Sequence, residues 1–406
     1  MVHRTCPIAA ADPNAIAIAP DLTYGQLNQK ISAIRFGSKK FLSLTADPNP
    51  ETFCLLFAAW RASLPVFLLP PGKQAPSGSC FKCDLSLFTS GSSGTPKIAS
   101  FMRSQLFESA HTVSAALKAK PQDRWLLSLP LHHVGGLGVA LRAFCSEGTL
   151  VFVDKSLPYP DRLLSAKTAF ASCVPTQLYR LLKEDFPAIS THFLIGGAPL
   201  SQPLYEEALR RGLRISLTYG LTEMSSTVIL SSAPFWKDHL PFLGFPLRGR
   251  EILLANNEIL LKGEPLFEGY GSPPQEPLAW FPRGDLAADD ESHGYKILGR
   301  KDSLFFCGGE NIYPEEIETA LLSIPEMEQA VVVPLNDEEF GARPAAFLKT
   351  SLSKEKIISS LSSLLTKNKI PILFSPLEET NSLKPDRKKL TELMNIQRDA
   401  SNMGKK

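Results

Sequence analysis

Residues 87–97 read Leu-Phe-Thr-Ser-Gly-Ser-Ser-Gly-Thr-Pro-Lys, an apolar, strand-like entry followed by hydroxyl groups, two glycines and a lysine. Hydroxyl groups supply hydrogen-bond donors, and glycines let backbone N–H groups approach a ligand closely. The lysine adds a mobile positive charge. A surface turn has a similar composition, so the stretch alone suits a phosphate-binding loop or a turn. It does not fit a P-loop, because Pro96 and Lys97 stand where that motif requires Gly-Lys-Ser/Thr.

The length and charge of the chain predict an ordinary globular protein. Its 406 residues, 44% of them hydrophobic, suffice for a large domain and a smaller one. Lysine and arginine total 43 against 41 aspartate and glutamate, so the bulk charge gives no indication of a nucleic acid partner. The first residues lack an apolar signal core, and the longest apolar run, residues 53–60, is far shorter than the ~20 residues of a membrane span. We therefore expect no membrane span.

The seven cysteines are scattered and odd in number, which is typical of a reducing compartment rather than of a disulfide framework. Cys80 and Cys83 form a lone Cys-x-x-Cys pair. Without a second pair or nearby histidines, we interpret them as incidental thiols, with a metal or redox site as the alternative. These features predict a cytoplasmic protein.

The order of apolar segments predicts an α/β fold. Helical and strand-like segments alternate through residue 220, which is the pattern of layered α/β structure. Residues 251–261 then place two apolar runs on either side of Asn256 and Asn257, a pair that suits a tight hairpin turn. We expect layered α/β subdomains and a β-rich portion within one large N-terminal domain, residues 1–301.

A change of character near residue 299 predicts a second, smaller domain. Gly299 opens an expected turn, and Pro314 begins a helix with two glutamates in its first turn. Two strands and a helix from about residue 354 to 366 follow. We expect a small α+β domain over residues 302–406, large enough to fold around its own core.

Two further stretches carry possible chemistry. Residues 196–200 read Gly-Gly-Ala-Pro-Leu, and residues 217–223 read Leu-Thr-Tyr-Gly-Leu-Thr-Glu. Taken singly, the first is also typical of a turn and the second of a strand end with a helix cap.

Taken in order with residues 87–97, and followed by Gly284-Asp285, Gly299-Arg300 and residues 308–311 (Gly-Gly-Glu-Asn), these stretches resemble the adenylate-forming superfamily. That superfamily contains acyl-CoA synthetases, peptide-synthetase adenylation domains and luciferases. Residues 130–137, 174–182 and 305–318 resemble its o-succinylbenzoate CoA ligase branch, which serves menaquinone or phylloquinone biosynthesis.

The resemblance implies an enzyme that uses ATP, Mg²⁺ and CoA on a small-molecule carboxylic acid. The nucleotide- and CoA-binding residues that it implies are Thr89, Ser90, Gly91, Ser92, Ser93, Gly94, Thr95, Lys97, Gly196, Gly197, Ala198, Tyr219, Gly220, Thr222, Asp285, Arg300, Gly308 and Gly309. Residues 89–97 would hold the β- and γ-phosphates, and residues 196–198 with Tyr219 would flank adenine. Asp285 would bind the ribose hydroxyls, with Arg300 beside it on ribose or phosphate.

The implied catalytic residues are Lys384, His133, Thr222 and Glu223. Glu223 is also the implied ligand of Mg²⁺, an ion that prefers hard oxygen donors. Lys384 would bridge the substrate carboxylate and the α-phosphate, with Lys388 and Lys389 as competitors for that role. Leu383 stands where the family usually has glycine before this lysine, and Arg283 replaces the usual threonine before Gly-Asp.

For thioester formation, the resemblance implies a mobile C-terminal domain that turns about a hinge at Asp302. Its Gly308-Gly309 loop would then line the pantetheine tunnel. His133 matches a gating histidine; a metal site or a satisfied polar pair with His132 is the alternative.

The acid itself stays open at this point. Its pocket is expected between residues 174–182, the 196 loop and residues 219–227, with Ser225, Ser226 or Thr227 as donors for a second carboxylate. Alternative functions are a CoA ligase for another aryl or fatty acid, a stand-alone adenylation domain that charges a carrier protein, and a non-catalytic ATP-binding protein. Homo-oligomer formation also stays open.

Overall fold

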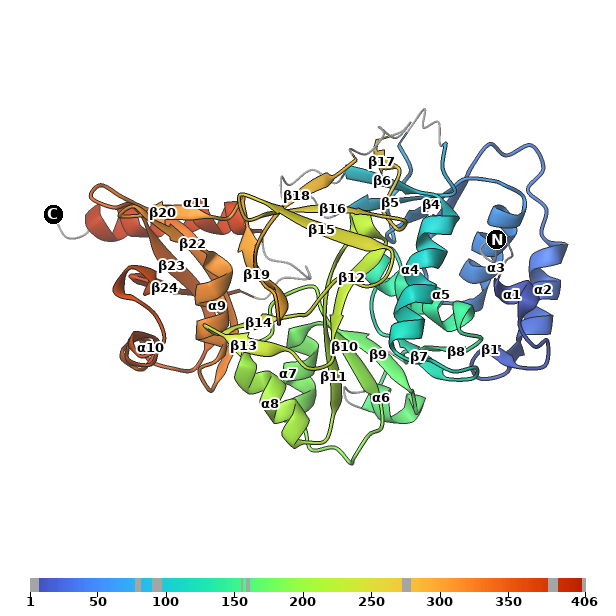
Figure 1. Ribbon diagram of the computed structural model, residues 1–406, viewed down its shortest axis with the longest axis horizontal. Helices are drawn as coiled ribbons and strands as arrows, with labels where there is room; N and C mark the ends of the chain where they lie inside the picture. The colour runs from blue at the N-terminus through green and yellow to red at the C-terminus, as the bar shows by residue number, and fades with distance from the viewer. Residues whose placement is uncertain are drawn as a thin grey trace.

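The computed structural model describes residues 7–76, 82–89, 97–154, 156–157, 161–271, 279–378 and 386–403. Figure 1 shows the blue-to-yellow part of the chain on the right and centre, and the orange-to-red part, which holds β20 to β24 and α9 to α11, on the left. The mixed α/β architecture expected from the sequence is confirmed.

The largest sheet is built mainly from parallel strands. In order across the sheet these are β12 (Ser226–Ser231), β11 (Arg214–Leu221), β10 (His192–Ile195), β9 (Phe170–Cys173), β7 (Arg124–Leu127), β8 (Thr149–Phe152), β1 (Ile16–Ile18) and β2 (Leu22–Thr23). Strands β8, β7, β9, β10 and β11 run parallel, and β12 pairs antiparallel with β11. The carboxyl ends of parallel strands meet at one edge, where α/β proteins commonly bind ligands.

A second sheet contains the strands on either side of residues 90–96. Its order is β17 (Gly269–Tyr270), β6 (Lys97–Phe101), β5 (Leu85–Thr89), β4 (Val66–Leu69) and β3 (Leu42–Thr45). Strands β5 and β6 pair antiparallel, with Thr89 opposite Lys97. Residues 90–96, which follow Thr89 and precede Lys97 in the sequence, lie outside the described residues.

A third, antiparallel sheet is the β-rich portion. Its order is β13 (Phe235–Lys237), β14 (Leu240–Phe242), β19 (Gly294–Arg300), β18 (Phe281–Asp290), β16 (Glu258–Gly263) and β15 (Arg250–Ala255). Asn256 and Asn257 have φ of 52° and 64° between β15 and β16, which confirms the predicted hairpin. Gly299 and Arg300 end strand β19, so the expected turn begins later, at Lys301.

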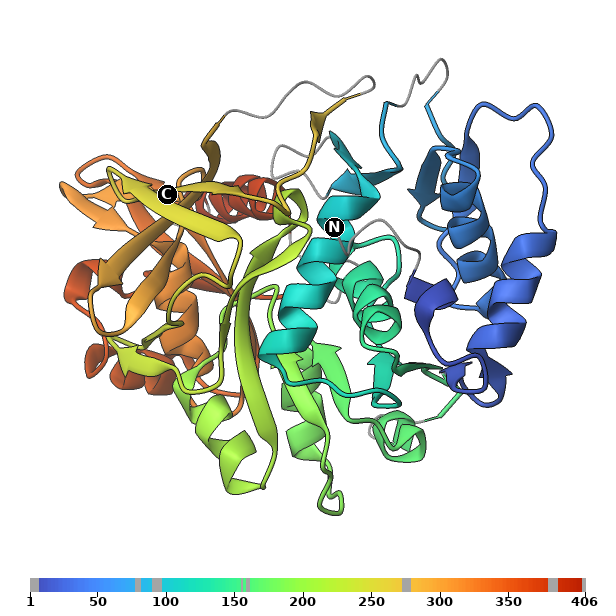
Figure 2. The same ribbon diagram turned by 45° about the vertical axis from the view of Figure 1, so that its right-hand side comes forward.

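The helices lie against these sheets (Figure 2). Their bounds are α1 (Pro7–Ala10), α2 (Tyr24–Ala33), α3 (Pro50–Arg61), α4 (Arg103–Ala116), α5 (Val134–Cys145), α6 (Asp161–Ala166), α7 (Pro175–Lys183), α8 (Gln202–Arg210), α9 (Pro314–Leu322), α10 (Lys354–Ser362) and α11 (Arg387–Met403), with 3₁₀ turns η2 (Thr222–Met224) and η3 (Lys367–Lys369). Among the described helices, none is long and apolar enough to cross a bilayer.

Local sequence explains several helix starts. Asn49 caps α3 by accepting a hydrogen bond from the Thr52 amide at 2.9 Å, and Pro50 occupies the first turn.

In the core, α3 and α5 pack through Phe53, Phe57 and Phe144, whose rings meet edge to face at 5.4–5.5 Å. Burial of each ring contributes about 1.5–3 kcal/mol.

The residues after Phe305 have a core of their own. Strands β20 (Phe305–Cys307), β21 (Glu310–Ile312), β22 (Met327–Asp337), β23 (Gly341–Thr350) and β24 (Leu373–Pro376) form one sheet. Ile317, Leu321 and Val332 are buried between α9 and this sheet. The predicted helix start at Pro314 is confirmed.

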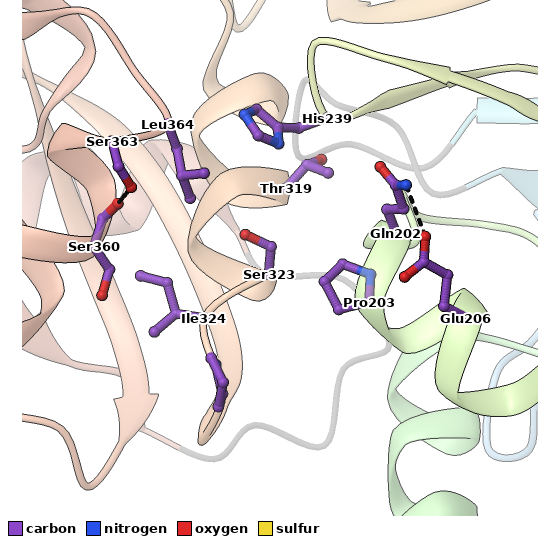
Figure 3. Close-up of a pocket in the computed structure, with 11 residues that line it drawn as sticks. Gln202, Pro203, Glu206, His239, Thr319, Ser323, Ile324, Ser360, Ser363 and Leu364 are labelled. Carbon is purple, nitrogen blue, oxygen red and sulfur yellow. Dashed lines mark hydrogen bonds between the residues drawn. The ribbon is translucent and has the colours of Figure 1, made fainter. Parts of the chain in front are cut away.

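A crevice with a mixed polar and apolar lining lies between this C-terminal part and the rest of the chain. It has a volume of about 460 Å³ and opens between α8 on one side and α9 and α10 on the other (Figure 3). Its lining includes Thr319, Ser323, Ser360 and Ser363, and within it Gln202 donates to Glu206 at 2.8 Å. The two parts are therefore not closely packed against each other here.

A buried charge cluster lies where the two parts join. Arg387, the first residue of α11, donates to both carboxylate oxygens of Glu318 at 2.6 and 2.8 Å and to the Val332 carbonyl at 2.6 Å. Its other contact is with Glu315 at 3.3 Å. The second oxygen of Glu315 has no hydrogen-bond partner and packs against Gly299, where a Cβ would come within 2.3 Å of it.

This environment predicts a pH-dependent stability. Burial raises the pKa of the Glu315 carboxyl to about 7, against the opposing charge of Arg387. The folded state then holds a proton that the unfolded chain has released, so stability is lost as pH rises from about 4.5 towards 7. From pH 5 to 8 we expect the melting temperature of the wild type to fall by roughly 3–6 °C relative to Glu315→Gln.

Melting curves of Glu315→Gln and of the exposed control Glu338→Gln, measured across that pH range, check this prediction. Parallel curves for the wild type and Glu315→Gln would show that Glu315 titrates normally.

Candidate functional site

The expected nucleotide residues lie at the carboxyl-end edge of the largest sheet and at the adjoining ends of β18 and β19. Residues 196–198 follow β10, and residues 219–223 form the end of β11 and the turn η2. Because β10 and β11 run parallel and in register, both segments emerge at the same edge.

Asp285 is the centre of a hydrogen-bonded network. The Tyr219 hydroxyl donates to Asp285 Oδ2 at 2.7 Å, and Arg300 Nη1 donates to Oδ1 at 3.0 Å. Arg300 also binds both oxygens of Asp302 at 3.0 and 3.1 Å. Burial, then the charge of Asp285, raises the pKa of Tyr219, so that its hydroxyl stays a donor. The structure thus brings Tyr219, Asp285 and Arg300 together and fixes the carboxylate as an acceptor.

Glu223 is the centre of a second cluster. Its side chain is 1% exposed, and the Tyr270 hydroxyl donates to its Oε1. Arg283 Nε lies 3.4 Å from Oε2, but Oε2 has no hydrogen-bond partner. Lys97 stands over the Tyr270 ring at 4.9 Å from its centre. Sequence reasoning named Glu223 and Lys97 but missed Tyr270, because a single tyrosine after residues 265–269 gives no motif.

The surroundings of Glu223 fit the expected magnesium ion. A buried carboxylate oxygen without a hydrogen-bond partner is costly unless a ligand satisfies it, and carboxylate oxygen is what Mg²⁺ prefers. Among the described residues, no group of three acidic, histidine or cysteine side chains forms a protein-only metal cage. Glu223 therefore suits an ion whose other ligands come from substrate and water.

The glycines of the site have separate reasons. Gly197 has φ of +82°, and a Cβ on Gly196 would lie 2.2 Å from Thr218 Oγ1. A Cβ on Gly220 would lie 2.0 Å from the Ser226 carbonyl oxygen, so Gly220 is required by packing between β11 and β12. Ala198 follows the Gly196-Gly197 turn.

The residues after η2 have a strained backbone. Ser225 and Ser226 have φ of 51° and 106°, backbone angles that residues other than glycine rarely adopt. Ser225 Oγ donates to the Pro265 carbonyl at 2.8 Å, which helps to hold this turn. Such strain concentrates at functional sites.

Arg142 is a buried cation behind these serines, and the sequence did not reveal it. It is 3% exposed on α5 and donates to Ser226 Oγ at 3.0 Å and Thr227 Oγ1 at 3.3 Å. Among the described residues, no acidic side chain forms an ion pair with it, whereas neighbouring Arg250 lies near Glu108 and Glu264. Burial, and then the charge of Arg250, lowers the pKa of Arg142 to about 10.

The residues expected to act with CoA lie apart from this cluster. His133 is the residue before α5, with its ring 4.3 Å from that of His132, and burial lowers the pKa of His132. Gly308 and Gly309, with φ of 57° and 84°, form the tip of the β20–β21 hairpin in the C-terminal part. The ring of Phe306 beside them is 62% exposed.

Two expected components fall outside the described residues. They are the phosphate-loop residues Ser90, Gly91, Ser92, Ser93, Gly94 and Thr95, and the catalytic candidate Lys384. Thr222, which is described, lies in η2 directly beside Glu223. The interpretation of the Cys80–Cys83 pair also stays a prediction, since of the two only Cys83, a buried free thiol, is described.

Comparison with known proteins agrees with this arrangement. A family model described as "AMP-binding enzyme" matches residues 85–270. The 2-succinylbenzoate–CoA ligase of Salmonella typhimurium is 40% identical over 270 residues, which are 64% of this chain and 57% of that enzyme. The match therefore spans less than two thirds of that relative's length.

Solved structures are similar over nearly the whole chain. A variant of E. coli MenE with bound OSB-AMS superimposes with a TM-score of 0.82 at 27% identity, covering 98% of this chain and 100% of that one. The o-succinylbenzoate coenzyme A synthetase (MenE) of Bacillus subtilis, in complex with ATP and magnesium ion, gives 0.82 at 25% identity, with coverages of 94% and 98%. The chain is thus similar to AMP-binding enzymes over residues 85–270, and in its fold as a whole to solved MenE structures.

Proposed function

We propose that the protein is an ATP-dependent acid–CoA ligase that converts o-succinylbenzoate to its CoA thioester through an acyl adenylate, a step of menaquinone or phylloquinone biosynthesis. The observation that carries the proposal is that the site contains two carboxylates, Asp285 and Glu223, with different hydrogen-bond environments. Asp285 is held by Tyr219 and Arg300, as a ribose acceptor requires, and Glu223 keeps an unbonded oxygen, as a metal ligand requires. The relatives named 2-succinylbenzoate–CoA ligase, and the neighbour that holds ATP and magnesium, support it.

In the first half-reaction, the substrate carboxylate attacks the α-phosphate of ATP, and pyrophosphate leaves. Asp285 fixes the ribose, residues 196–198 with Tyr219 flank the base, and Glu223 would hold Mg²⁺. The bound ion would offset charge on the polyphosphate. Positioning and preorganised positive charge supply most of the rate enhancement in such a step.

In the second half-reaction, the CoA thiolate attacks the acyl carbonyl and AMP leaves. We propose that residues 302–406 turn about Asp302 between the two steps, which would bring Gly308 and Gly309 to the pantetheine and leave His133 as the gate. The crevice between α8 and α9 supports this proposal, because the facing walls of the two parts are already separated there.

Arg142 supports the choice of a diacid. A buried guanidinium without a carboxylate partner is costly, and a substrate anion would supply the missing charge. The hydroxyls of Ser226 and Thr227 accept from Arg142 and bond to each other at 3.4 Å, which leaves one hydroxyl proton to donate. They therefore suit the second carboxylate of o-succinylbenzoate while the first one reacts.

Substitution of Arg142 should separate diacid from monoacid substrates. In Arg142→Met, which keeps the apolar stem, we expect KM for o-succinylbenzoate to rise roughly 100-fold, since a charge-assisted contact is lost. The KM for ATP should change less than threefold. Steady-state kinetics with each substrate varied in turn measures both, and Arg210→Met on the exposed face of α8 is the matched control. Equal losses for both substrates would contradict a role in the acid pocket.

Acid-dependent ATP–pyrophosphate exchange tests the proposed function as a whole. We expect exchange with o-succinylbenzoate, little with benzoate or a fatty acid, and a CoA thioester by mass spectrometry once CoA is added. Exchange with a different acid would indicate another CoA ligase. Transfer to a carrier protein but not to CoA would indicate an adenylation domain, and no exchange with any acid would indicate a non-catalytic protein. The cytoplasmic location and the oligomeric state stay predictions.

A further inference from the structure

Arg283 lies beside the expected metal ligand, although threonine is usual at this position. Its Nε is 3.4 Å from Glu223 Oε2, and the two side chains are 24% and 1% exposed. Arg283 belongs to β18 and stands two residues before Asp285, so one strand brings it to the nucleotide site. No ATP- or metal-binding role has so far been assigned to Arg283.

The ion pair between Arg283 and Glu223 is incomplete. Neither Arg283 Nε nor Glu223 Oε2 has a hydrogen-bond partner, although both atoms are buried. A buried N–H donor and a buried oxygen acceptor that face each other without bonding each lose hydration. Such a pair can be completed by a third group that offers an acceptor to Nε and a cation to Oε2. A phosphate oxygen with its bound metal ion has both.

The surroundings of Arg283 lie along the expected path of the polyphosphate. Burial raises the pKa of Tyr219, which belongs to the Asp285 network, and of Tyr270, which binds Glu223, and Arg283 is near enough to both hydroxyls for its charge to oppose that rise. Arg283 thus stands between the ribose end and the metal end of the site. Lys97, over the Tyr270 ring, adds a second positive charge at the metal end.

We propose that Arg283 is a charge-exchanging cation of the nucleotide site, which pairs with Glu223 before the nucleotide binds and with a polyphosphate oxygen of ATP afterwards. Mg²⁺ takes the place of Arg283 on Glu223 in the second state. This inference rests on the proposed function only in requiring that ATP binds here, and it does not depend on the acid.

This exchange predicts that loss of Arg283 changes the affinities for a divalent cation and for ATP in opposite directions. Loss of Arg283 removes the competitor for Glu223, so a divalent cation should bind more tightly when no nucleotide is present. The same loss removes a phosphate-binding group, so ATP should bind more weakly, and most of all when no metal is present. A residue with a merely structural role would weaken both.

The experiment measures both affinities in the intact protein. Calorimetry gives the affinity for ATP in EDTA, and the paramagnetic resonance of free Mn²⁺ gives the affinity for Mn²⁺ without nucleotide. For Arg283→Thr we expect roughly 10- to 100-fold weaker ATP binding in EDTA and roughly 10-fold tighter Mn²⁺ binding. Arg283→Lys, which keeps the charge, should stay within about threefold of the wild type in both, and the exposed control Arg210→Thr should match the wild type.

Three results would overturn the inference. They are an ATP affinity of Arg283→Thr in EDTA within twofold of the wild type, a loss of Mn²⁺ affinity that accompanies the loss of ATP affinity, and a wild type that does not bind ATP at all. The last would also overturn the proposed function. A wild type that binds ATP but adenylates no acid would overturn the proposed function alone.

Discussion

Replacement of Lys384 by alanine is expected to slow acyl-adenylate formation by roughly 100- to 1,000-fold, because the proposed role of this lysine is to offset the negative charge that accumulates between carboxylate and α-phosphate. Thioester formation from supplied acyl adenylate and CoA should stay within about threefold of the wild type, since the lysine would act in the first step alone. Pyrophosphate release and thioester formation, measured separately in rapid-mixing experiments, check the two steps.

The start of α11 supplies matched controls for this prediction. Lys388 and Lys389 are exposed in its first turn, and Arg387 just before them is bound to Glu318. Lys388→Ala and Lys389→Ala should therefore each keep at least half of the adenylation rate. If either variant loses as much of the adenylation rate as Lys384→Ala, the family lysine has been assigned to the wrong residue. This outcome is worth testing because Leu383 stands where the family usually has glycine before the lysine.

Replacement of Asp285 by asparagine is expected to lower kcat/KM for ATP by roughly 100-fold. The change keeps the size of the side chain but removes the charge that pairs with Arg300 at 3.0 Å, and an amide nitrogen cannot accept from Tyr219 or a ribose hydroxyl. The KM for the acid should change little, because the proposed acid pocket does not include this network. ATP titrations at saturating acid, and acid titrations at saturating ATP, separate the two effects.

Asp290→Asn is the control for Asp285→Asn. It lies at the far end of the same strand, β18, with its side chain 43% exposed and bound to His293. It should leave both kinetic constants within twofold of the wild type. Equal losses in Asp285→Asn and Asp290→Asn would show that β18 is merely destabilised.

Local sequence predicted local structure well. The Asn256-Asn257 hairpin and the helix that begins at Pro314 depend on backbone preferences of residues within a few positions, so pattern and propensity suffice. Residues 217–223 could likewise be placed at a strand end, because the apolar run stops at that point.

Long-range pairings could not be predicted in this way. Arg142 lies in an otherwise apolar helix, where a lone arginine is ordinarily a surface residue, and its contact with Ser226 spans 84 positions. Tyr270 reaches Glu223 because β17 pairs with β6, a pairing between distant segments. Arg283 was noticed as a departure from the family pattern, but its approach to Glu223 depends on how the sheets meet.

The strained turn at Ser225 and Ser226 has a consequence for selection. Positive φ at two consecutive serines costs on the order of 1–3 kcal/mol each, and glycine would remove much of that cost. Directed evolution for heat resistance alone should therefore repeatedly recover glycine at these two positions. Lineages selected also for the proposed ligase activity should keep serine at position 226, because its hydroxyl is bound to Arg142. At this turn, selection for thermal stability therefore favours glycine, and selection for activity favours serine.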